Sequence, residues 1–490
     1  MAGCTVGPDF HSPEPPAVTR YTPEPLPAET ASSEGPGGQA QRFVSERDVP
    51  AEWWTLFQCP ALDDLVRQAL ADSPALAQAK SKLVKAQEDF QARRGATRMP
   101  KIDAGISGTR VYVQPESFDV PELPIETPFT VYAASLSVSY TLDLFGKSRR
   151  ELEGLQARVD YERFELEAAR LALAGNVVTA AIEEASLRAQ IEATEAIVAL
   201  QARRLEIVER REQLGGVARV DVVTQQGELA RARASLPDLR ERLERTRHRL
   251  AVYLGQLPGE VQLPEVKLAD LQLPAELPLS VPSELVHRRP DIQAAEALLH
   301  EASAQVGVAT ANLYPRITLS GTGGSLTTVL ASLFGSGTGF YFLGATLAQK
   351  VFHGGELKAQ KRSAVAAFEQ AGAAYREVVL TGFQSVADTL SALNYDAQAL
   401  QERSAAAGHA ETTYEITARR YDAGGVSLLE LLDAQRQSLT ASLDRTKATA
   451  DRYGDSAALF LMLGGGWWNS ADKGSGTAGT KPETSAETRP

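Results

Sequence analysis

The chain contains two copies of one pattern at a constant separation. LGGVARVDVV, which starts at Leu214, matches AGGVSLLELL, which starts at Ala423. AVYLGQLPG, with Leu254-Gly255, matches ALFLMLGGG, with Leu463-Gly464. Both matches are offset by 209 residues. A single offset across distant matches predicts an internal two-fold sequence repeat, in which each half folds into the same set of elements.

Each half contains a predicted helix of unusual length. From Lys147 to Leu214 the chain has no proline, and apolar residues recur every seven positions from Leu152, which is coiled-coil periodicity. These 68 residues would form a helix of about 100 Å at about 1.5 Å per residue. The second half repeats the pattern over residues 356–422. Such a helix is too long to lie inside one compact globule.

A double glycine follows each long helix. Gly215-Gly216 and Gly424-Gly425 supply residues at which a positive φ costs little, so a helix can stop there and the chain can turn back. The sequence therefore predicts two tall antiparallel helical hairpins.

Segments with strand periodicity precede each long helix. Residues 129–142, FTVYAASLSVSYTL, place apolar side chains on one face and small polar ones on the other. Their predicted partner is IDAGISGTRVYV from Ile102, joined through the proline-rich residues 114–128. In the second half, ITLSGTGGS from Ile317 and FYFLGATLAQKVF from Phe340 take the same places. We therefore expect four strands per chain.

The second strand pair has the composition of a lipid-facing sheet. Residues 317–349 contain no charged side chain, yet glycine is scattered through them, which fits barrel strands in lipid better than a spanning helix. Four strands cannot close a barrel, and an open edge in lipid leaves backbone groups unsatisfied. A dimer would supply eight strands and a trimer twelve, and only the larger number closes around an open lumen. We therefore predict a mixed α and β membrane protein that is completed by other copies of itself.

Charge and motif spacing exclude several classes of function. With 50 basic and 62 acidic residues the net charge is -12, whereas a nucleic-acid partner needs a concentrated positive face. Phe145-Gly146-Lys147-Ser148 ends like a phosphate-binding loop, but Thr141 occupies the place of the required first glycine. GSGTG at 335–339 lies between two predicted strands, so we interpret it as a barrel loop. The six histidines lack metal-ligand spacing. We expect no enzyme and no metal site.

Several motifs, in order along the chain, carry a resemblance to a known family. They are Gly3-Cys4-Thr5-Val6-Gly7-Pro8-Asp9-Phe10, Trp53-Trp54, Leu144-Phe145-Gly146, Arg289-Pro290-Asp291-Ile292, Tyr314-Pro315 and Leu432-Asp433-Ala434-Gln435-Arg436. With the repeat and the glycine-turned hairpins, they resemble the outer membrane factor family of Gram-negative efflux systems, the TolC-like channels. The resemblance is to its lipoprotein branch, the OprM- and NodT-like channels of RND-type multidrug efflux, and it covers nearly everything from Cys4 to Trp468.

The resemblance implies a fold and a division of the chain. It implies a homotrimer with a 12-stranded outer-membrane β-barrel, four strands per chain, that continues into a long periplasmic α-helical barrel with an equatorial domain around it. We expect an N-terminal lipid-anchor and equatorial segment over residues 1–72 and a first structural repeat over 73–270. A second repeat follows over 271–466, and an equatorial or disordered tail over 467–490.

The resemblance also explains Cys4. Met1-Ala2-Gly3-Cys4 is similar to the end of a bacterial lipobox, after which Cys4 would become the mature N-terminus and carry acyl chains, such as palmitate, into outer membrane lipid. This covalent lipid is the only cofactor that we expect. The alternative is a free or buried thiol without a role.

Four residues fall where family members constrict the periplasmic entrance: Tyr421, Leu429, Asp433 and Arg436. The spacing of four and then three from Leu429 places the last three on one helix face. The resemblance implies that this face points inward as a gate. The alternative for Asp433 and Arg436 is an ordinary surface salt bridge, which contributes about 0–1 kcal/mol.

In the first repeat, Asp221 stands at the position equivalent to Glu430. It is either a charge link across helices within the gate or an ordinary solvated helix start. A periplasmic membrane fusion (adaptor) protein is expected to dock on the hairpin tips, around Gly215, Gly216, Val217, Gly424, Gly425 and Val426. The energy would come from an inner-membrane RND transporter.

The resemblance predicts the exit duct of a tripartite efflux pump, which conducts drugs or other small molecules passively from the periplasm to the outside. Antibiotics are the expected cargo, ahead of metals or solvents. Two alternatives remain: the outer membrane component of a type I protein secretion system, which shares this fold, and a coiled-coil envelope spacer. The sparsely charged strand pairs disfavour the spacer, and the GPDF opening favours small molecules over protein cargo.

Overall fold

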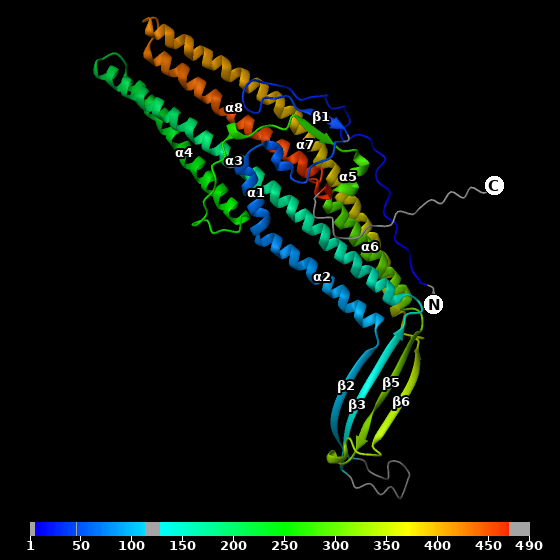
Figure 1. Ribbon diagram of the computed structural model, residues 1–490. Coiled ribbons are helices and arrows are strands. Elements are labelled where there is room, and N and C mark those ends of the chain that lie inside the picture. Colours follow the sequence, from blue (N-terminus) through cyan, green and yellow to red (C-terminus); the bar gives the residue numbers. More distant parts are fainter. Residues whose placement is uncertain (1–4, 46, 113–127, 470–490) are drawn as a thin grey trace, which may run out of the picture. The chain divides into compact units, whose positions relative to one another are not determined.

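The computed structural model describes residues 5–45, 47–112 and 128–469 (Figure 1). Cys4, most of the proline-rich connection and residues 470–490 lie outside the described residues. The chain forms two compact units. Unit 1 comprises residues 1–14, 80–164 and 293–378, and unit 2 comprises residues 15–79, 165–292 and 379–490. Each unit thus takes residues from both predicted repeats.

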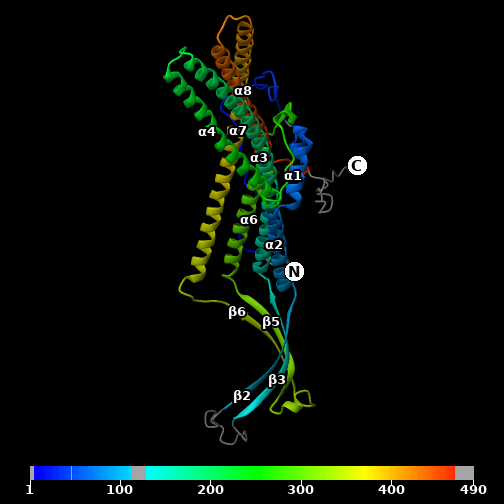
Figure 2. The ribbon, with the colours of Figure 1, turned by 90° about the vertical axis from the view of Figure 1, so that its left-hand side faces the viewer.

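Unit 1 contains an antiparallel four-stranded sheet in the order β2-β3-β5-β6 (Figure 2). Its strands are β2 (Lys101–Val111), β3 (Phe129–Leu142), β5 (Arg316–Thr327) and β6 (Gly339–Ala348). All four strands were predicted, β3 from its alternation, β2 as its partner, and β5 and β6 as their counterparts in the second half of the chain. A short 3-10 helix, η4 (Leu330–Ser332), lies in the connection between β5 and β6. The glycine-rich stretch at 335–339 lies in the same connection, as predicted.

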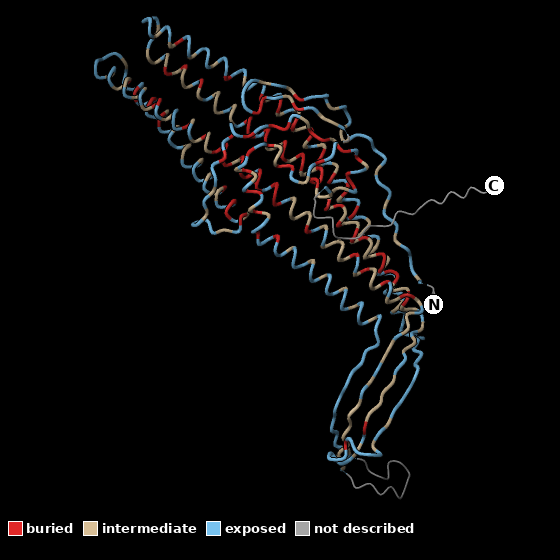
Figure 3. Tube along the Cα trace, viewed as in Figure 1, coloured by how far each residue is buried: buried red, intermediate tan, exposed pale blue. Residues whose placement is uncertain are grey.

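The register gives the sheet two different faces. Ser137 pairs with Thr322 and Thr141 pairs with Thr318, and their hydroxyls hydrogen-bond at 3.1 and 3.2 Å. The opposite face of β3 carries the apolar residues of the alternation. β2 and β6 form the two edges, and neither outer edge is paired within the chain. Both edge strands are exposed along almost their whole length (Figure 3).

Long helices dominate both halves of the sequence. α3 (Lys147–Gln213) and α7 (Glu356–Asp422) each have 67 residues, and α4 (Arg219–Tyr253) and α8 (Leu428–Met462) each have 35. The shorter α2 (Pro74–Arg98) and α6 (Pro290–Ala311) precede the strand pairs. The sequence pattern therefore predicted the bounds of α3 and α7 to within one residue. No described helix is both long enough and apolar enough to cross a membrane.

The core of unit 2 forms where short elements from the N-terminal, middle and C-terminal parts of the chain gather beside α8. The elements are β1 (Arg42–Ser45), η1 (Trp53–Phe57), α1 (Pro60–Asp72), η3 (Leu268–Asp270), β4 (Glu276–Leu279), α5 (Pro282–Arg288) and η5 (Trp467–Asn469). β1 and β4 pair in parallel. Trp53 stacks on Phe460 with 5.5 Å between ring centroids, and the hydroxyl of Tyr453 donates to the carbonyl of Leu271 at 2.7 Å. These buried aromatic rings fix the extended N-terminal segment to the long helices.

Candidate functional site

The hairpin tips are tight turns built on glycine. Gly215 and Gly424 both have a φ of 77°, and the amides of Gly216 and Gly425 bond back to the carbonyls of Arg211 at 2.8 Å and Arg420 at 2.7 Å. The four glycines are exposed, and the two valines of the tips, Val217 and Val426, are half-buried. The two tips thus share one backbone geometry, which places a small apolar side chain beside each turn.

The helices that follow the tips begin with different caps. The carboxylate of Asp221 accepts a hydrogen bond from the amide of Ala218 at 3.0 Å, and the hydroxyl of Ser427 accepts one from the amide of Glu430 at 3.2 Å. Asp221 makes no ion pair with any other residue that the structure describes. Within one chain Asp221 therefore acts as a helix cap. This favours an ordinary solvated helix start over a charge link within the gate.

Asp433 is the centre of a polar cluster below the second tip. Its carboxylate accepts from Arg436 at 3.2 Å on the same helix, from Arg204 of α3 at 3.2 Å, and from Gln437 at 3.0 Å. Leu429 lies one turn before Asp433 and is half-buried, as is Tyr421 in the last turn of α7. Because Arg204 belongs to the first hairpin and Asp433 to the second, this contact joins the two hairpins of one chain.

The Asp433 carboxyl is held in its charged form. Partial burial on its own would raise its pKa, but the hydrogen bonds and charges of Arg436 and Arg204 outweigh that effect and lower the pKa below its ordinary value. A carboxyl with a depressed pKa in the folded state stabilises the fold above its ordinary pKa and loses that contribution only when the pH falls through the depressed value. The Asp433 links therefore persist throughout the physiological pH range.

A second acidic cluster lies deeper in unit 2. Asp396 of α7 and Asp451 and Asp455 of α8 line a cavity of about 570 Å³, together with Arg242 and Lys447. Burial, together with the neighbouring carboxyls of Asp396 and Asp451, raises the pKa of Asp455 to about 8 against the opposing charge of Arg452. Asp455 is therefore protonated at neutral pH, unlike Asp433. No described group of three or more His, Cys, Asp or Glu side chains is suited to hold a metal ion.

Replacing Asp455 with Asn is expected to stabilise the protein at high pH. A raised folded-state pKa means that stability is complete below the ordinary pKa of Asp and is lost as the pH rises toward 8. Asp455→Asn should therefore raise the thermal midpoint at pH 8, measured by circular dichroism in detergent, and leave it nearly unchanged at pH 4. Asp444→Asn, an exposed acid on the same helix, is the control. An equal shift of the Asp455→Asn midpoint at both pH values would contradict this assignment.

The segment after Cys4 is docked in unit 1. The amide of Val6 donates to the carbonyl of Phe145 at 3.2 Å, and Asp9 pairs at 2.7 Å with Arg150, whose side chain is only 5% exposed. Phe10 stacks on His300 with 4.3 Å between ring centroids. The GPDF motif is therefore a folded attachment between the N-terminus and the start of α3.

Gly7 makes this close approach possible. It has a φ of 99°, and a Cβ at this position would lie 2.5 Å from the Cα of Gly307. Any other residue would clash and would be strained. The pattern Gly3 to Phe10 was recognised in the sequence, but its partners Arg150, His300 and Gly307 were not.

Comparison with known proteins extends over most of the chain. The family model described as outer membrane efflux protein matches residues 65–256 and 281–465. The pyoverdine export outer membrane protein OpmQ of Pseudomonas putida is 31% identical over 458 residues, which cover 93% of this chain and 94% of that protein. The probable efflux pump outer membrane protein TtgC of Pseudomonas putida is 29% identical and covers 96% of this chain and 94% of its own length.

This chain is also similar in fold to solved structures of outer membrane proteins. The outer-membrane channel OprN has a TM-score of 0.81 at 28% identity and covers 95% of this chain and 100% of that one. The outer membrane protein VceC of Vibrio cholerae has a TM-score of 0.75 at 26% identity, with 86% of this chain and 100% of that chain covered.

Proposed function

The chain belongs to the outer membrane efflux protein family and is an efflux channel of the outer membrane, and from that premise we propose that three copies of it form the passive exit duct of a tripartite pump. The observation that carries this proposal is the four-stranded sheet with one apolar face, one polar face and two unpaired edges. Such a sheet is incomplete alone, because unpaired backbone groups in lipid cost several kcal/mol each.

Pairing between chains would satisfy the backbone hydrogen-bonding groups of both edge strands. β6 of one chain would pair with β2 of the next, so that three copies close a barrel of twelve strands with the polar face around a water-filled lumen. The equal lengths of α3 and α7, and of α4 and α8, support the internal two-fold repeat and an α-helical barrel built from six such hairpins. The short elements packed on α8 would form the equatorial domain.

The tips and the Asp433 cluster would form the gate. An adaptor protein would dock on the exposed glycine turns and bind the splayed state better than the closed one, which shifts the population toward the open state. The family consists of channel proteins, and we propose that this chain likewise performs no chemistry. The energy would come from an inner-membrane RND transporter, since no pattern in the sequence fits a nucleotide.

Cys4 would carry acyl chains in the mature protein. The docked segment supports this, because Val6 is bonded to Phe145, close to the point at which β3 ends and α3 begins. An acyl chain on Cys4 would therefore leave the protein near the end of its sheet. Mass spectrometry of the N-terminal peptide from the native membrane tests the assignment: a Cys4 without acyl mass would refute it.

The cargo is proposed to be small molecules, with antibiotics first among them. OpmQ is named for pyoverdine export and other relatives for toluene or solvent efflux, so the relatives differ in what they carry. Export of a protein by a type I system is the second candidate, because the fold is shared.

Deletion of the gene is expected to lower the minimal inhibitory concentration of several antibiotics at once, since every substrate of a pump leaves through the same exit duct. The full chain supplied in trans should restore resistance. A deletion of the partner pump should give the same profile, and the double deletion should add nothing. Unchanged susceptibility together with the loss of one secreted protein would favour the type I alternative.

A further inference from the structure

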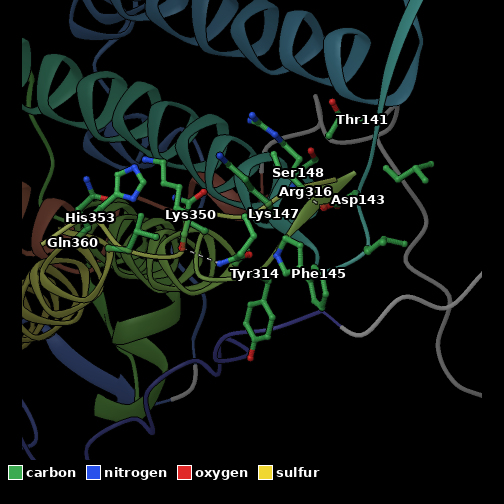
Figure 4. Close-up of a pocket in the computed structure, with 18 of the residues that line it drawn as sticks. Thr141, Asp143, Phe145, Lys147, Ser148, Tyr314, Arg316, Lys350, His353 and Gln360 are labelled. Atoms are coloured by element: carbon green, nitrogen blue, oxygen red, sulfur yellow. Dashed lines mark hydrogen bonds between the residues drawn. The ribbon is translucent and has the colours of Figure 1, made fainter. Parts of the chain in front are cut away.

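Three connections of unit 1 surround one cavity where the strands meet the helices. They are residues 141–148 between β3 and α3, 311–316 between α6 and β5, and 348–360 between β6 and α7. The cavity has a volume of about 470 Å³, and Figure 4 shows that side chains from all three connections gather around it.

The cavity is rich in cationic side chains. Lys147, Arg316 and Lys350 line it, one from each connection (Figure 4). Arg316 and Lys350 have no carboxylate within 4.0 Å among the residues that the structure describes. Lys147 lies 3.9 Å from Glu151, which is also paired with Arg93. Two of these cations are therefore without a counter-charge.

The acids of the lining are already engaged. Asp143 accepts hydrogen bonds from the amides of Ser148 at 3.2 Å and Arg149 at 3.0 Å, at the start of α3, and lies 3.5 Å from the Arg149 guanidinium. Glu356 accepts a bond from Gln360 at 3.0 Å. The Asp143 charge is thus compensated by the helix N-terminus and by Arg149, and Glu356 is the one lining carboxylate without a cationic partner among the described residues.

The strand register places Arg316 on the polar face of the sheet. Arg316 pairs with Ala348, and Thr318, two residues further, pairs with both Thr141 and Thr346. Since side chains alternate along a strand, Arg316 shares the face of Thr318 and Thr141. Lys350 follows Ala348 by two residues and lines the same cavity. This is the face that the proposed barrel turns toward its lumen.

We propose that Lys147, Arg316 and Lys350, repeated in each chain of the trimer, form a cationic collar in the lumen at the entry to the barrel, which transiently binds anionic small molecules. The proposal rests on the trimeric duct proposed above. A ring of like charges in a pore raises the local concentration of oppositely charged solutes and disfavours those of the same sign. Carboxylates, phosphates and sulfonates are the cargo groups that such a collar favours.

The collar is tested by ion selectivity of the purified trimer in planar bilayers. Under a KCl gradient the wild-type channel should pass chloride in preference to potassium, and the double variant Arg316→Gln, Lys350→Gln should lower the ratio of chloride to potassium permeability about twofold or more. Arg110→Gln is the matched control, since Arg110 pairs with Thr130 on the opposite face of the sheet. It removes the same charge from the face turned to lipid and should leave the ratio unchanged.

The salt dependence of the ion selectivity provides a second test of the collar. The Debye length is about 10 Å at 0.1 M and about 3 Å at 1 M, so the difference between the double variant and the wild type should shrink at 1 M KCl. If the double variant does not assemble, Lys350→Gln alone provides the test, because Lys350 lies outside the strands. A conducting variant with the wild-type reversal potential overturns the collar. A wild-type protein that does not conduct overturns the duct itself, so the two failures are distinguishable.

Discussion

Replacing Asp433 with Ala is expected to open the closed channel. The change removes the hydrogen bonds from Arg204 and Arg436, and the first of these links the two hairpins of a chain near their tips. The side chains of Asp433 and Arg436 are each 38% exposed, so solvent screening limits each link to about 1 kcal/mol. Three chains opening together would lose about 3 kcal/mol, roughly a hundredfold change in the ratio of open to closed channels. In the proposed trimer, threefold symmetry would thus make a weak contact sufficient to act as a gate.

Single-channel recording and antibiotic entry measure this opening. The Asp433→Ala and Arg204→Ala variants should both show conductance well above the wild type, and the double variant should add little, because each single change already removes the inter-hairpin link. Glu430→Gln is the matched control, since Glu430 lies three residues earlier on α8, is exposed and makes no ion pair with any residue that the structure describes. Wild-type conductance in both single variants would remove this cluster from the gate. Acidification to pH 5 should not open the wild type, because the pKa of Asp433 is lowered.

The helices and strands follow from the sequence because each has its own period. The alternation over 129–142 and the heptads after Lys147 are local patterns, and both led to the observed elements within one or two residues. The glycine pairs at the tips likewise predicted turns, because a positive φ is a property of a single position.

Contacts between distant residues carry no such local signal. Arg204 and Asp433 are 229 residues apart in sequence, and nothing in the heptads of α3 distinguishes Arg204 from its neighbours. The pairing of β1 with β4 joins two strands of four residues, too short for alternation to indicate a partner. Tertiary packing alone sets the surroundings of Asp455 and Arg316, so the sequence predicted neither the protonated acid nor the cationic lining.

Proline at the outer edge of the sheet is expected to abolish assembly. Gly344 and Ala345 are neighbours in β6, opposite Ser320 and Leu319 of β5. In an antiparallel strand, successive amides point to opposite sides, so one of these two amides faces β5 and the other faces the outer edge. Gly344→Pro and Ala345→Pro therefore remove donors from different ladders.

The two proline variants show whether the outer edge of β6 pairs with another chain or stays unpaired. If β6 pairs with β2 of the next chain, both prolines break a ladder that the barrel needs, and both should leave monomers in detergent, measured by light scattering, with no conductance. If β6 is a free edge in the functional molecule, proline is tolerated at the position whose amide points outward, and that variant assembles and conducts as the wild type does.

Val329→Pro, in the connection between β5 and β6, is unsuitable as a control because the Val329 amide donates to the Thr327 hydroxyl at 3.2 Å. Ser336→Pro, in the same connection, avoids that loss and is the control, since Ser336 makes no hydrogen bond with any described residue. Because a barrel in lipid tolerates no unpaired edge, the outward-facing proline is the variant that decides whether this chain is one third of a channel.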